Sequence, residues 1–481
     1  MNRRAFLTNA GLLIPAGLVP FNFAESISSS ASEIPLSVDL TRSVATIPPD
    51  FIGLGYEISS VARPGLLSAT NSVYVQLVRA LGKRGVIRVG GNTADYASYS
   101  ANGSPASLPE GKGGSVVNDA VLRDLGGFLK ATGWQLIWAL NLGSGTVQNA
   151  VEEARSIMRA AEDHLLAFEI GNEPDLFSRN PHRHRSYGYD DYLREFRQYR
   201  DALQKALPGI AFAAPDSATA TDWVTRFATD EGANIKLLTE HYYRDGAKNP
   251  TATIEELLHP DPKLATMLQH LKAASNSSGL RYRICETNSF YGGGKPGVSD
   301  TFASALWVLD FMFTLASAGC AGVNMETGVN QLGFVSHYSP IGDDEHGHYG
   351  ASPEYYGMLA FAQAGVGRIV GCSMDALEKN VSAYATQPDS KHLVLTIINK
   401  EPSYDADLVL KRETSPSVKS AQLVRLSAPR LESKSGVTLG DAAVSATGAW
   451  RSTSGKPVAI HNAGLKLNVP RASALIASLS F

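Results

Sequence analysis

The sequence predicts an α/β protein in which a (β/α)8 TIM barrel is accompanied by an antiparallel β-sandwich domain. Two observations lead to this prediction. Between residues 49 and 365, short apolar runs alternate with amphipathic helical stretches, which is the pattern of a parallel barrel with a filled interior. Across residues 366–481, short segments alternate apolar and polar residues between Gly, Pro, Asn and Ser, as in a small sandwich.

Eight apolar runs supply the predicted barrel strands. In chain order they are 51–58, 86–89, 135–141, 167–172, 210–214, 237–243, 282–286 and 322–326. Helical periodicity lies between them, most clearly at 120–132, 146–163, 189–206 and 302–318. Active sites of such barrels lie at the C-terminal ends of the strands, so polar residues at those ends are the candidates for chemistry.

The predicted sandwich strands are 381–386, 392–399, 405–410, 420–426 and 465–481. Residues 32–48, which precede the barrel, are also rich in strand-forming residues. We expect this N-terminal strand to join the sandwich, which makes the second domain discontinuous in sequence.

The N-terminal segment reads as an export signal. Arg3 and Arg4 precede an apolar run at 10–21 that is too short, and too interrupted by proline, to cross a bilayer. The paired arginines resemble those of twin-arginine signals. We therefore expect residues 1–31 to be a signal peptide and the protein to be exported, either periplasmic or secreted.

The composition excludes several classes of protein. The chain of 481 residues is 44% hydrophobic, which is far too apolar for a disordered chain. Its 43 Lys and Arg against 46 Asp and Glu give a net charge of −3, so we expect neither a nucleic acid nor a membrane as partner. The oligomeric state is left open.

Two predicted strands end in a carboxylate that faces the expected cleft. Strand four leads into Asn172-Glu173-Pro174, and strand seven ends at Glu286. Two carboxylates across a cleft are what cleavage of a glycosidic bond needs, since one protonates the leaving oxygen while the other attacks the sugar or activates water. A lone carboxylate there would more often be a structural ion-pair partner. Asn172 is placed to hydrogen-bond a sugar 2-OH.

Other strand ends add candidates for the sugar pocket. Glu57 and Arg88, at the ends of strands one and two, can contact sugar hydroxyls or orient Glu286, and for Arg88 ion pairing is favoured. The long loop 331–349 after strand eight, with Phe334 and Tyr338, is expected to form a wall of the pocket.

Three motifs resemble a known family. Asn172-Glu173-Pro174 with Glu286 resembles the clan of retaining barrel glycosidases. Within that clan, Tyr291-Gly292-Gly293-Gly294-Lys-Pro296 after the second Glu, together with Arg88-Val-Gly-Gly-Asn92, resembles glycoside hydrolase family 79, the β-glucuronidase and heparanase family.

The resemblance implies a role for each matching residue. Glu173 corresponds to the acid/base, Glu286 to the nucleophile and Asn172 to the residue that holds the 2-OH. Tyr291 and the Gly293 N–H, with Gly292 or Gly294 beside it, correspond to the loop that receives the C6 carboxylate of the sugar. Tyr243 of His241-Tyr242-Tyr243 lies where clan members place a tyrosine that hydrogen-bonds the nucleophile.

The function expected from these residues is a retaining exo-β-glucuronidase. It would remove terminal β-D-glucuronic acid from a carbohydrate through a covalent glycosyl-enzyme. An endo-acting, heparanase-like enzyme is the main alternative, but the chain lacks the Lys/Arg-rich segments that a sulfated polymer calls for. A carbohydrate-binding protein without catalysis is a third interpretation, and arabinofuranosidases and xylosidases have no need of a carboxylate-binding loop.

We expect no metal and no cofactor. Two histidine pairs, His182 with His184 and His346 with His348, are the sequence features that suggest a metal. Neither pair has a third ligand at a defined spacing, and glycosidic chemistry of this type needs no metal.

Overall fold

The computed structural model describes residues 33–481 apart from 104–113, 181, 332–335, 345, 377, 412–417, 453–454, 458–459 and 462–463. The predicted export signal and Phe334 lie outside the described residues. No helix in the described part of the chain is long and apolar enough to cross a membrane.

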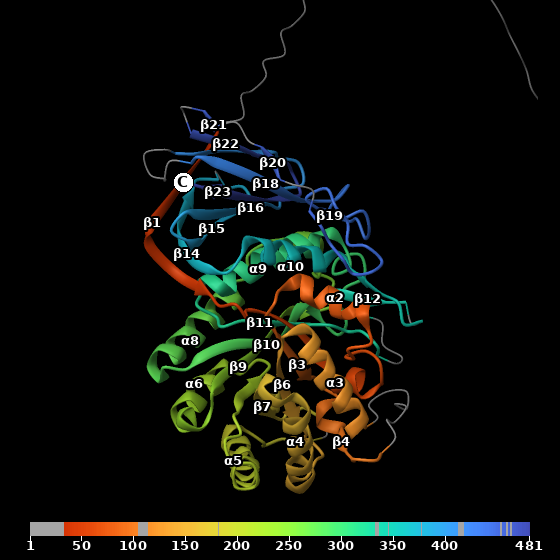
Figure 1. Ribbon diagram of the computed structural model, residues 1–481. Helices are drawn as coiled ribbons and strands as arrows, with labels where there is room; N and C mark the ends of the chain where they lie inside the picture. Colours follow the sequence, from red (N-terminus) through yellow and green to blue (C-terminus); the bar gives the residue numbers. More distant parts are fainter. Residues whose placement is uncertain are drawn as a thin grey trace, which may run out of the picture. The chain divides into compact units, whose positions relative to one another are not determined.

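Eight parallel strands form the predicted barrel (Figure 1). They are β2 (Ile52–Glu57), β3 (Val86–Gly90), β6 (Gln135–Leu140), β7 (Leu165–Ile170), β8 (Ala213–Ser217), β9 (Leu237–Gly246), β10 (Arg281–Tyr291) and β11 (Val323–Glu326). Each pairs with the next along the chain, and β11 returns to pair with β2. A bridge between Phe168 and Phe212 joins β7 to β8 and completes the ring. The TIM-barrel prediction is therefore confirmed.

The longer helices outside the barrel strands are α2 (Ser72–Leu81), α3 (Asp119–Thr132), α4 (Val147–Ala161), α5 (Tyr189–Ala206), α6 (Thr221–Asp230), α8 (Pro262–Ser278), α9 (Phe302–Ser317) and α10 (Pro353–Ala364). Local chemistry sets their ends. In α3, for example, the Asn118 side chain accepts hydrogen bonds from the first free backbone N–H groups. Gly133 then ends that helix in the left-handed conformation.

Short elements fill the connections. They are helices α1 (Ile58–Ala62) and α7 (Ile254–Leu258), 3-10 turns η1 (Ala94–Tyr96), η2 (Glu162–His164), η3 (Pro174–Leu176) and η4 (Gly232–Asn234), and strand pairs β4 (Ser98–Tyr99) with β5 (Val116–Val117) and β12 (Ile341–Asp343) with β13 (Tyr349–Ala351). Several of them lie in the loops that follow barrel strands, where the candidate residues are.

A second, mostly antiparallel sheet forms the other part of the fold. Its main path runs β19-β18-β23-β16-β15-β14-β1-β17-β22-β21, with β20 beside β18. The bounds are β1 (Ile34–Ile47), β14 (Gly367–Met374), β15 (Val381–Asp389), β16 (His392–Asn399), β17 (Ala406–Leu410), β18 (Ser420–Ser427), β19 (Thr438–Leu439), β20 (Lys456–Pro457), β21 (Ile460–His461), β22 (Gly464–Val469) and β23 (Ser473–Ser480). The N-terminal strand β1 lies between β14 and β17 and pairs in parallel with β17.

The two faces of this sheet bury different residues. On β16, Leu393, Leu395 and Ile397 belong to a core that also includes residues of β1, β17 and β22, so the sheet folds over on itself as a sandwich. Val394 and Ile398 alternate with them and belong to the barrel core instead. Figure 1 shows α9 and α10 between the barrel and the sheet. This position explains why α9 is buried on almost every side and lacks the amphipathic pattern of a surface helix.

Several predicted strands differ from the observed ones. In the sandwich, the predicted strand 465–481 is two strands, β22 and β23, and β14 was not predicted. Strand β8 begins three residues later than expected and continues through Pro215 and Asp216, because the buried Asp216 is paired with charged partners there. Strands β9 and β10 run on to Gly246 and Tyr291, beyond the predicted ends, and pair along that extension.

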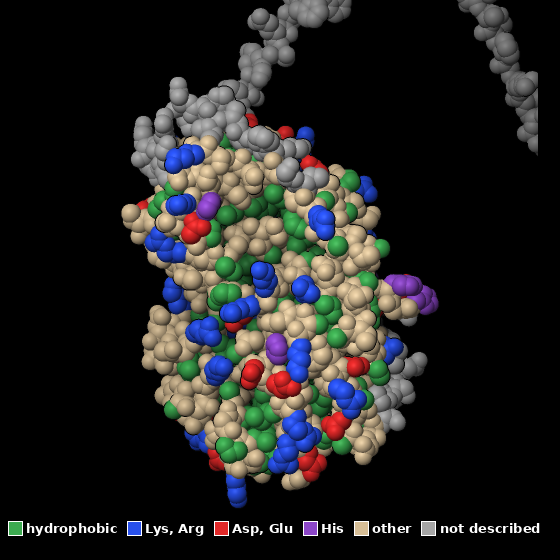
Figure 2. All heavy atoms as spheres, viewed as in Figure 1, with side chains coloured by type: hydrophobic (Ala, Val, Ile, Leu, Met, Phe, Trp, Pro, Cys, Tyr) green, Lys and Arg blue, Asp and Glu red, His purple; other side chains and the backbone are tan. Residues whose placement is uncertain are grey.

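On the face shown in Figure 2, acidic and basic side chains are interspersed over the barrel helices.

Candidate active site

Strand alternation and two β-bulges aim the candidate side chains into one cluster at the C-terminal end of the barrel. The pairing of β10 with β9 shifts register between Ile284 and Glu286, and that of β8 with β9 shifts between Pro215 and Ser217. Bulges of this kind redirect side chains and are common beside active sites. Asp216 and Glu286 both lie at these shifts.

Arg88 is the central cation of the cluster. Its guanidinium is fully enclosed and donates to Glu169 (2.9 Å), Asp216 (2.6 Å) and Glu286 (2.7 Å). Gly90 provides the space, since a Cβ there would lie 2.5 Å from the Arg88 Cζ. Every nitrogen of the guanidinium donates within the protein, which favours the predicted ion-pairing role of Arg88 beside Glu286.

Asn172 is held with its amide nitrogen free. Arg88 donates to the Asn172 Oδ1 at 2.8 Å, and because a guanidinium can only donate, the oxygen must face it. The backbone N–H of Asn172 donates to the buried carboxylate of Asp95, which also accepts from the backbone N–H groups of Leu142 and Gly143. Among the described residues, Asn172 Nδ2 has no hydrogen-bond partner. A donor is thus presented beside Glu173.

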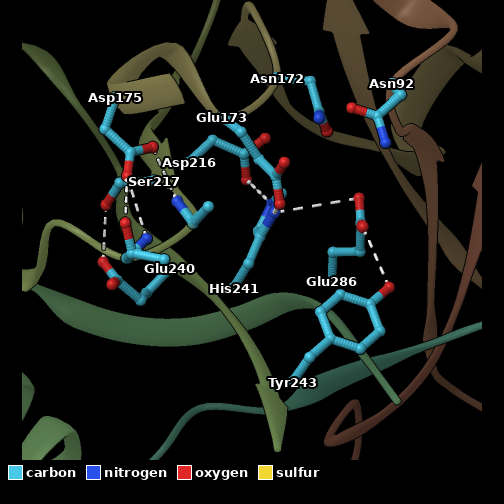
Figure 3. Close-up of polar contacts among 12 residues, drawn as sticks. Asn92, Asn172, Glu173, Asp175, Asp216, Ser217, Glu240, His241, Tyr243 and Glu286 are labelled. Atoms are coloured by element: carbon cyan, nitrogen blue, oxygen red, sulfur yellow. Dashed lines mark hydrogen bonds and ion pairs between the residues drawn. The ribbon is translucent and has the colours of Figure 1, made fainter. Parts of the chain in front are cut away.

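Glu173 shares a histidine with Asp216. His241 lies 3.0 Å from the Glu173 Oε1 through Nδ1 and 2.8 Å from the Asp216 Oδ1 through Nε2 (Figure 3). Although burial opposes the charge, Asp216 and Glu286 raise the pKa of His241 well above its usual value, so both ring nitrogens donate. Arg88 and His241 overcome the effect of burial on Asp216 and hold its pKa at about 2.

Glu173 and Glu286 have different surroundings. Burial raises the pKa of Glu173, although the hydrogen bond from His241 opposes this shift. Glu286 accepts from Arg88 and, at 3.0 Å, from the Tyr243 hydroxyl. A Glu173 oxygen, a Glu286 oxygen and a His241 nitrogen all lie within 4.8 Å of one another.

The pleat of β9 decides which of its aromatic residues reaches the site. His241 and Tyr243 point inward, while Tyr242 between them points outward. The Tyr242 ring stacks on Phe311 at 5.5 Å, and its hydroxyl donates to Asp261. Tyr243 is therefore the tyrosine that touches Glu286.

The glycine run at the end of β10 forms a turn that other residues do not readily adopt. Gly292, Gly293 and Gly294 have φ angles of 84°, 91° and 81°, where a side chain is strained. The Gly293 carbonyl accepts from the His337 N–H at 2.6 Å. Within the described chain neither Gly292 nor Gly293 donates its N–H to another residue, so these donors are available to a ligand.

Tyrosines surround this turn. Tyr291 is 57% exposed, and its ring meets the Tyr243 ring edge-on at 6.3 Å. Tyr338, in the loop after β11, is buried and stacks on the other side of Tyr243, also at 6.3 Å. Phe334, predicted beside it, is not among the described residues.

Glu57 is engaged by the loop that follows β3. Its carboxylate accepts from the Asn92 N–H (3.2 Å), the Thr93 N–H (2.8 Å) and the Thr93 hydroxyl (2.6 Å). Burial and the nearby Glu286 raise the pKa of Glu57 to about 7. Glu57 thus fixes the β3 loop at the edge of the cluster.

Four residues of the cluster were not selected from the sequence as site residues: Glu169, Asp216, His241 and Glu326. Glu169 and Asp216 each interrupt an apolar run with a charge, and such a charge inside a barrel needs a partner. Glu326 ends strand eight as Glu57 ends strand one, so the rule that selected Glu57 applies to it as well.

Two groups of side chains have the spacing of metal ligands: Glu173 with His241 and Glu286, and Glu169 with Asp216 and Cys285. In both groups the carboxylates are paired with Arg88 or His241, which already supply the positive charge that a metal would bring. The histidine pairs suggested by the sequence belong to neither group. His182 stacks between Tyr96 and Phe177, and the exposed His348 pairs with Asp344.

Sequence comparison relates the chain to carbohydrate-cleaving enzymes. No family model matches it. A β-glucuronidase of Aspergillus niger is 28% identical over 407 residues, which cover 77% of this chain and 73% of the relative. Heparanase of Mus musculus is 29% identical over 205 residues, covering 40% of this chain and 38% of the relative. These matches make the chain similar, over most of its length, to the β-glucuronidases of glycoside hydrolase family 79. The motifs around Glu173 and Glu286 had indicated this resemblance, which is thereby confirmed.

Solved structures share the fold. A 4-O-α-L-rhamnosyl-β-D-glucuronidase from Fusarium oxysporum 12S, in complex with Rha-GlcA, superposes with a TM-score of 0.75 at 19% identity, over 93% of this chain and 99% of that one. A family 51 arabinofuranosidase from Xanthomonas axonopodis pv. citri superposes with a TM-score of 0.70 at 15% identity, over 93% and 100%. The chain therefore shares this architecture with enzymes named for another sugar, and the residues of the site must decide the substrate.

Proposed function

We propose that this protein is a retaining exo-β-glucuronidase that releases terminal β-D-glucuronic acid. One observation carries the proposal: oxygens of Glu173 and Glu286 lie within 4.8 Å of each other, and Arg88 and Tyr243 donate to Glu286 while burial raises the pKa of Glu173. Retaining glycosidases hold their carboxyl groups about 5–5.5 Å apart, whereas inverting enzymes need about 6.5–9.5 Å to admit a water between them.

In the first step, a Glu286 oxygen bonds to the anomeric carbon as the bond to the leaving oxygen breaks. Glu173 gives its proton to that oxygen. Because the Glu173 Oε1 accepts from His241, the proton to be transferred is carried on Oε2. Hydrogen bonds from Arg88 and Tyr243 hold the Glu286 carboxylate in position for this attack.

In the second step, Glu173, now a carboxylate, takes a proton from water. The water oxygen bonds to the anomeric carbon, the bond to Glu286 breaks, and both carboxyl groups return to their starting states. The His241 imidazolium beside Glu173 stabilises the negative charge that Glu173 carries between the two steps.

Two further groups support a glucuronide as substrate. The unpaired Asn172 Nδ2 is available to the sugar 2-OH, a contact that strengthens at the transition state. In the described chain the N–H groups of Gly292 and Gly293 donate to no other residue, and with the hydroxyl of the exposed Tyr291 before them they are the donors that we assign to a carboxylate at C6.

Exo action is favoured over endo action by charge. A sulfated polymer requires an extended basic surface, and this chain has a net charge of −3 with acidic and basic side chains interspersed on the face in Figure 2. Product sizes from a long uronic acid polymer distinguish the two: single sugars are expected, and oligosaccharides would indicate endo cleavage. A carbohydrate-binding protein without catalysis is disfavoured by the presence of both carboxyl groups, whose oxygens lie within 4.8 Å of each other.

The decisive experiment uses aryl β-glycosides that differ only at C6, as carboxylate, hydroxymethyl or hydrogen. We expect the glucuronide to be hydrolysed at least about 100-fold faster, in kcat/KM, than the glucoside or the xyloside. Proton NMR of the first product should show the β anomer. Comparable rates on all three substrates would contradict the carboxylate assignment, and an initial α anomer would contradict retention.

A further inference from the structure

Glu326 is a buried carboxyl group that the proposed mechanism does not use. It ends β11, beside β2 on one side and β10 on the other. Only 3% of the residue is exposed, and in the described part of the chain neither side-chain oxygen has a hydrogen-bond partner. A buried carboxyl group without a hydrogen-bond partner destabilises a fold, so it is unusual unless a ligand completes the site.

The Glu326 side chain is directed at the catalytic cluster. Gly55 on β2 gives it room, since a Cβ at that position would lie 2.8 Å from the Glu326 Oε2. Titratable and charged groups of every surrounding element interact electrostatically with Glu326. They are Tyr56 and Glu57 of β2, Arg88 of β3, His241 and Tyr243 of β9, Glu286 of β10, and Tyr338 of the loop after β11.

The charges around Glu326 do not favour its ionisation. Glu57 and Glu286 are close enough to repel a third negative charge, and the Arg88 cation is already shared among Glu169, Asp216 and Glu286. Burial, reinforced by these two carboxylates, raises the pKa of Glu326 well above its usual value. The group therefore keeps its proton and offers one O–H donor and one carbonyl acceptor.

We propose that Glu326 is a specificity-determining residue, which as a neutral acid hydrogen-bonds a ring hydroxyl of the sugar and admits the glucuronate anion only while it keeps its proton. This inference rests on the proposed function. A glucuronide brings one more negative charge into a space that already holds Glu57 and Glu286. An ionised Glu326 would repel that anion, but it would not repel an uncharged sugar.

We expect glucuronide binding to weaken as the pH rises. At low pH Glu326 is neutral and glucuronide binds well. As the pH rises through the elevated pKa of Glu326, the group ionises and KM for a glucuronide increases. Glu57, whose pKa is about 7, also ionises as the pH rises, so a variant that alters Glu326 alone is needed to separate the two groups.

The experiment compares the wild-type enzyme with Glu326→Gln and Glu153→Gln, measuring kcat and KM for 4-nitrophenyl β-D-glucuronide from pH 4.5 to 9. Glu153 is the matched control, because it is another buried carboxyl whose pKa burial raises to about 7, but it bonds the Trp138 indole behind the barrel strand. We expect KM to rise roughly tenfold with pH in the wild type and in Glu153→Gln, and to rise clearly less in Glu326→Gln, where Glu57 remains to titrate.

Superimposable pH profiles of KM for Glu326→Gln and the wild type would overturn the inference while leaving the proposed function intact. If no glucuronide is hydrolysed at any pH, the proposed function fails and this inference fails with it. A measurement on the wild type alone covers the case in which Glu326→Gln does not fold. Inhibition by D-glucuronate should weaken as the pH rises while inhibition by D-glucose does not, and equal pH dependence for the two sugars would again overturn the inference.

Discussion

Arg88 and Glu286 are 198 residues apart in the chain and are joined by a 2.7 Å ion pair inside the barrel. The same guanidinium holds the Asn172 oxygen. One buried cation thus sets the position of the proposed nucleophile and the direction of the amide that faces the sugar. The following predictions test this arrangement and the residues around it.

Replacing Arg88 should destabilise the fold. In Arg88→Met, the buried Glu169, Asp216 and Glu286 lose their shared cation, so we expect the free energy of unfolding to fall by about 3–5 kcal/mol in urea denaturation. The control is Arg194→Met, because the Arg194 side chain is 70% exposed in its pair with Asp191. That change should cost less than about 1 kcal/mol. Similar losses in both variants would contradict the central role of Arg88.

Removing the proposed general acid should have an effect that depends on the leaving group. In Glu173→Gln, hydrolysis of a methyl or 4-methoxyphenyl glucuronide should slow about 10²–10⁴-fold, because those oxygens leave only when protonated. The burst of dinitrophenol from a 2,4-dinitrophenyl glucuronide should remain almost as fast as in the wild type, since that group leaves unprotonated. Chromatography of the released glucuronate follows the slow substrates and stopped-flow absorbance follows the burst, and an equal loss in the two cases would argue against Glu173 as the acid.

The role of Asn172 can be tested on two substrates. Asn172→Ala removes the free amide donor, and we expect kcat/KM for an aryl glucuronide to fall about 10²-fold or more. On the corresponding 2-deoxy glucuronide, wild type and variant should differ by less than about threefold, because the hydroxyl is absent. A large loss on the 2-deoxy substrate would mean that Asn172 acts through the structure around it.

Replacing Glu240 should increase the stability of the protein at high pH. It is buried beside His241 and accepts from Ser217 and Thr221, and burial raises its pKa to about 8. The unfolded chain releases this proton near pH 4.5 and the folded chain near pH 8, so stability falls as the pH rises between those values. Glu240→Gln should therefore melt at a higher temperature than the wild type at pH 8 and at a similar temperature at pH 4.5. A constant difference across pH would contradict the shift.

The glycine turn offers a matched pair of variants. Alanine at Gly292 or Gly294 is strained, since both have φ above 80°, and each should lower stability by about 1–2 kcal/mol. A Cβ at Gly292 enters open space, whereas one at Gly294 would lie 2.8 Å from the Tyr338 nitrogen. We expect Gly294→Ala to raise KM for glucuronide several-fold more than Gly292→Ala. Equal KM values would show that the contact with Tyr338 does not shape the pocket.

The parts that could be predicted from the sequence are those with a local pattern. Apolar runs of strand length recur with helices between them, and this periodicity located all eight barrel strands to within a few residues. Glu173 and Glu286 could be identified because each of them follows an apolar run and lies within a recognisable motif. The strand at Pro215 and Asp216 was misplaced, because a proline and a charge end a run in any local analysis.

Ion pairs and packing contacts between residues far apart in the chain could not be predicted from local sequence patterns. Nothing near Asp216 in sequence indicates that Arg88 and His241 will neutralise it. Likewise, the buried helix α9 has the composition of a core element only because the sandwich covers it. These features depend on which elements meet in space.

The sequence by itself determined the barrel, the accompanying sandwich and the two glutamates, because strand periodicity and short motifs are encoded by neighbouring residues. Only the tertiary structure decided which charges share Arg88, which face of β9 turns Tyr243 toward Glu286, and that Glu326 is buried without a partner. Burial and charge pairing are set by elements that lie far apart in the chain, so the protonation states on which the proposed chemistry depends emerge only when the barrel closes.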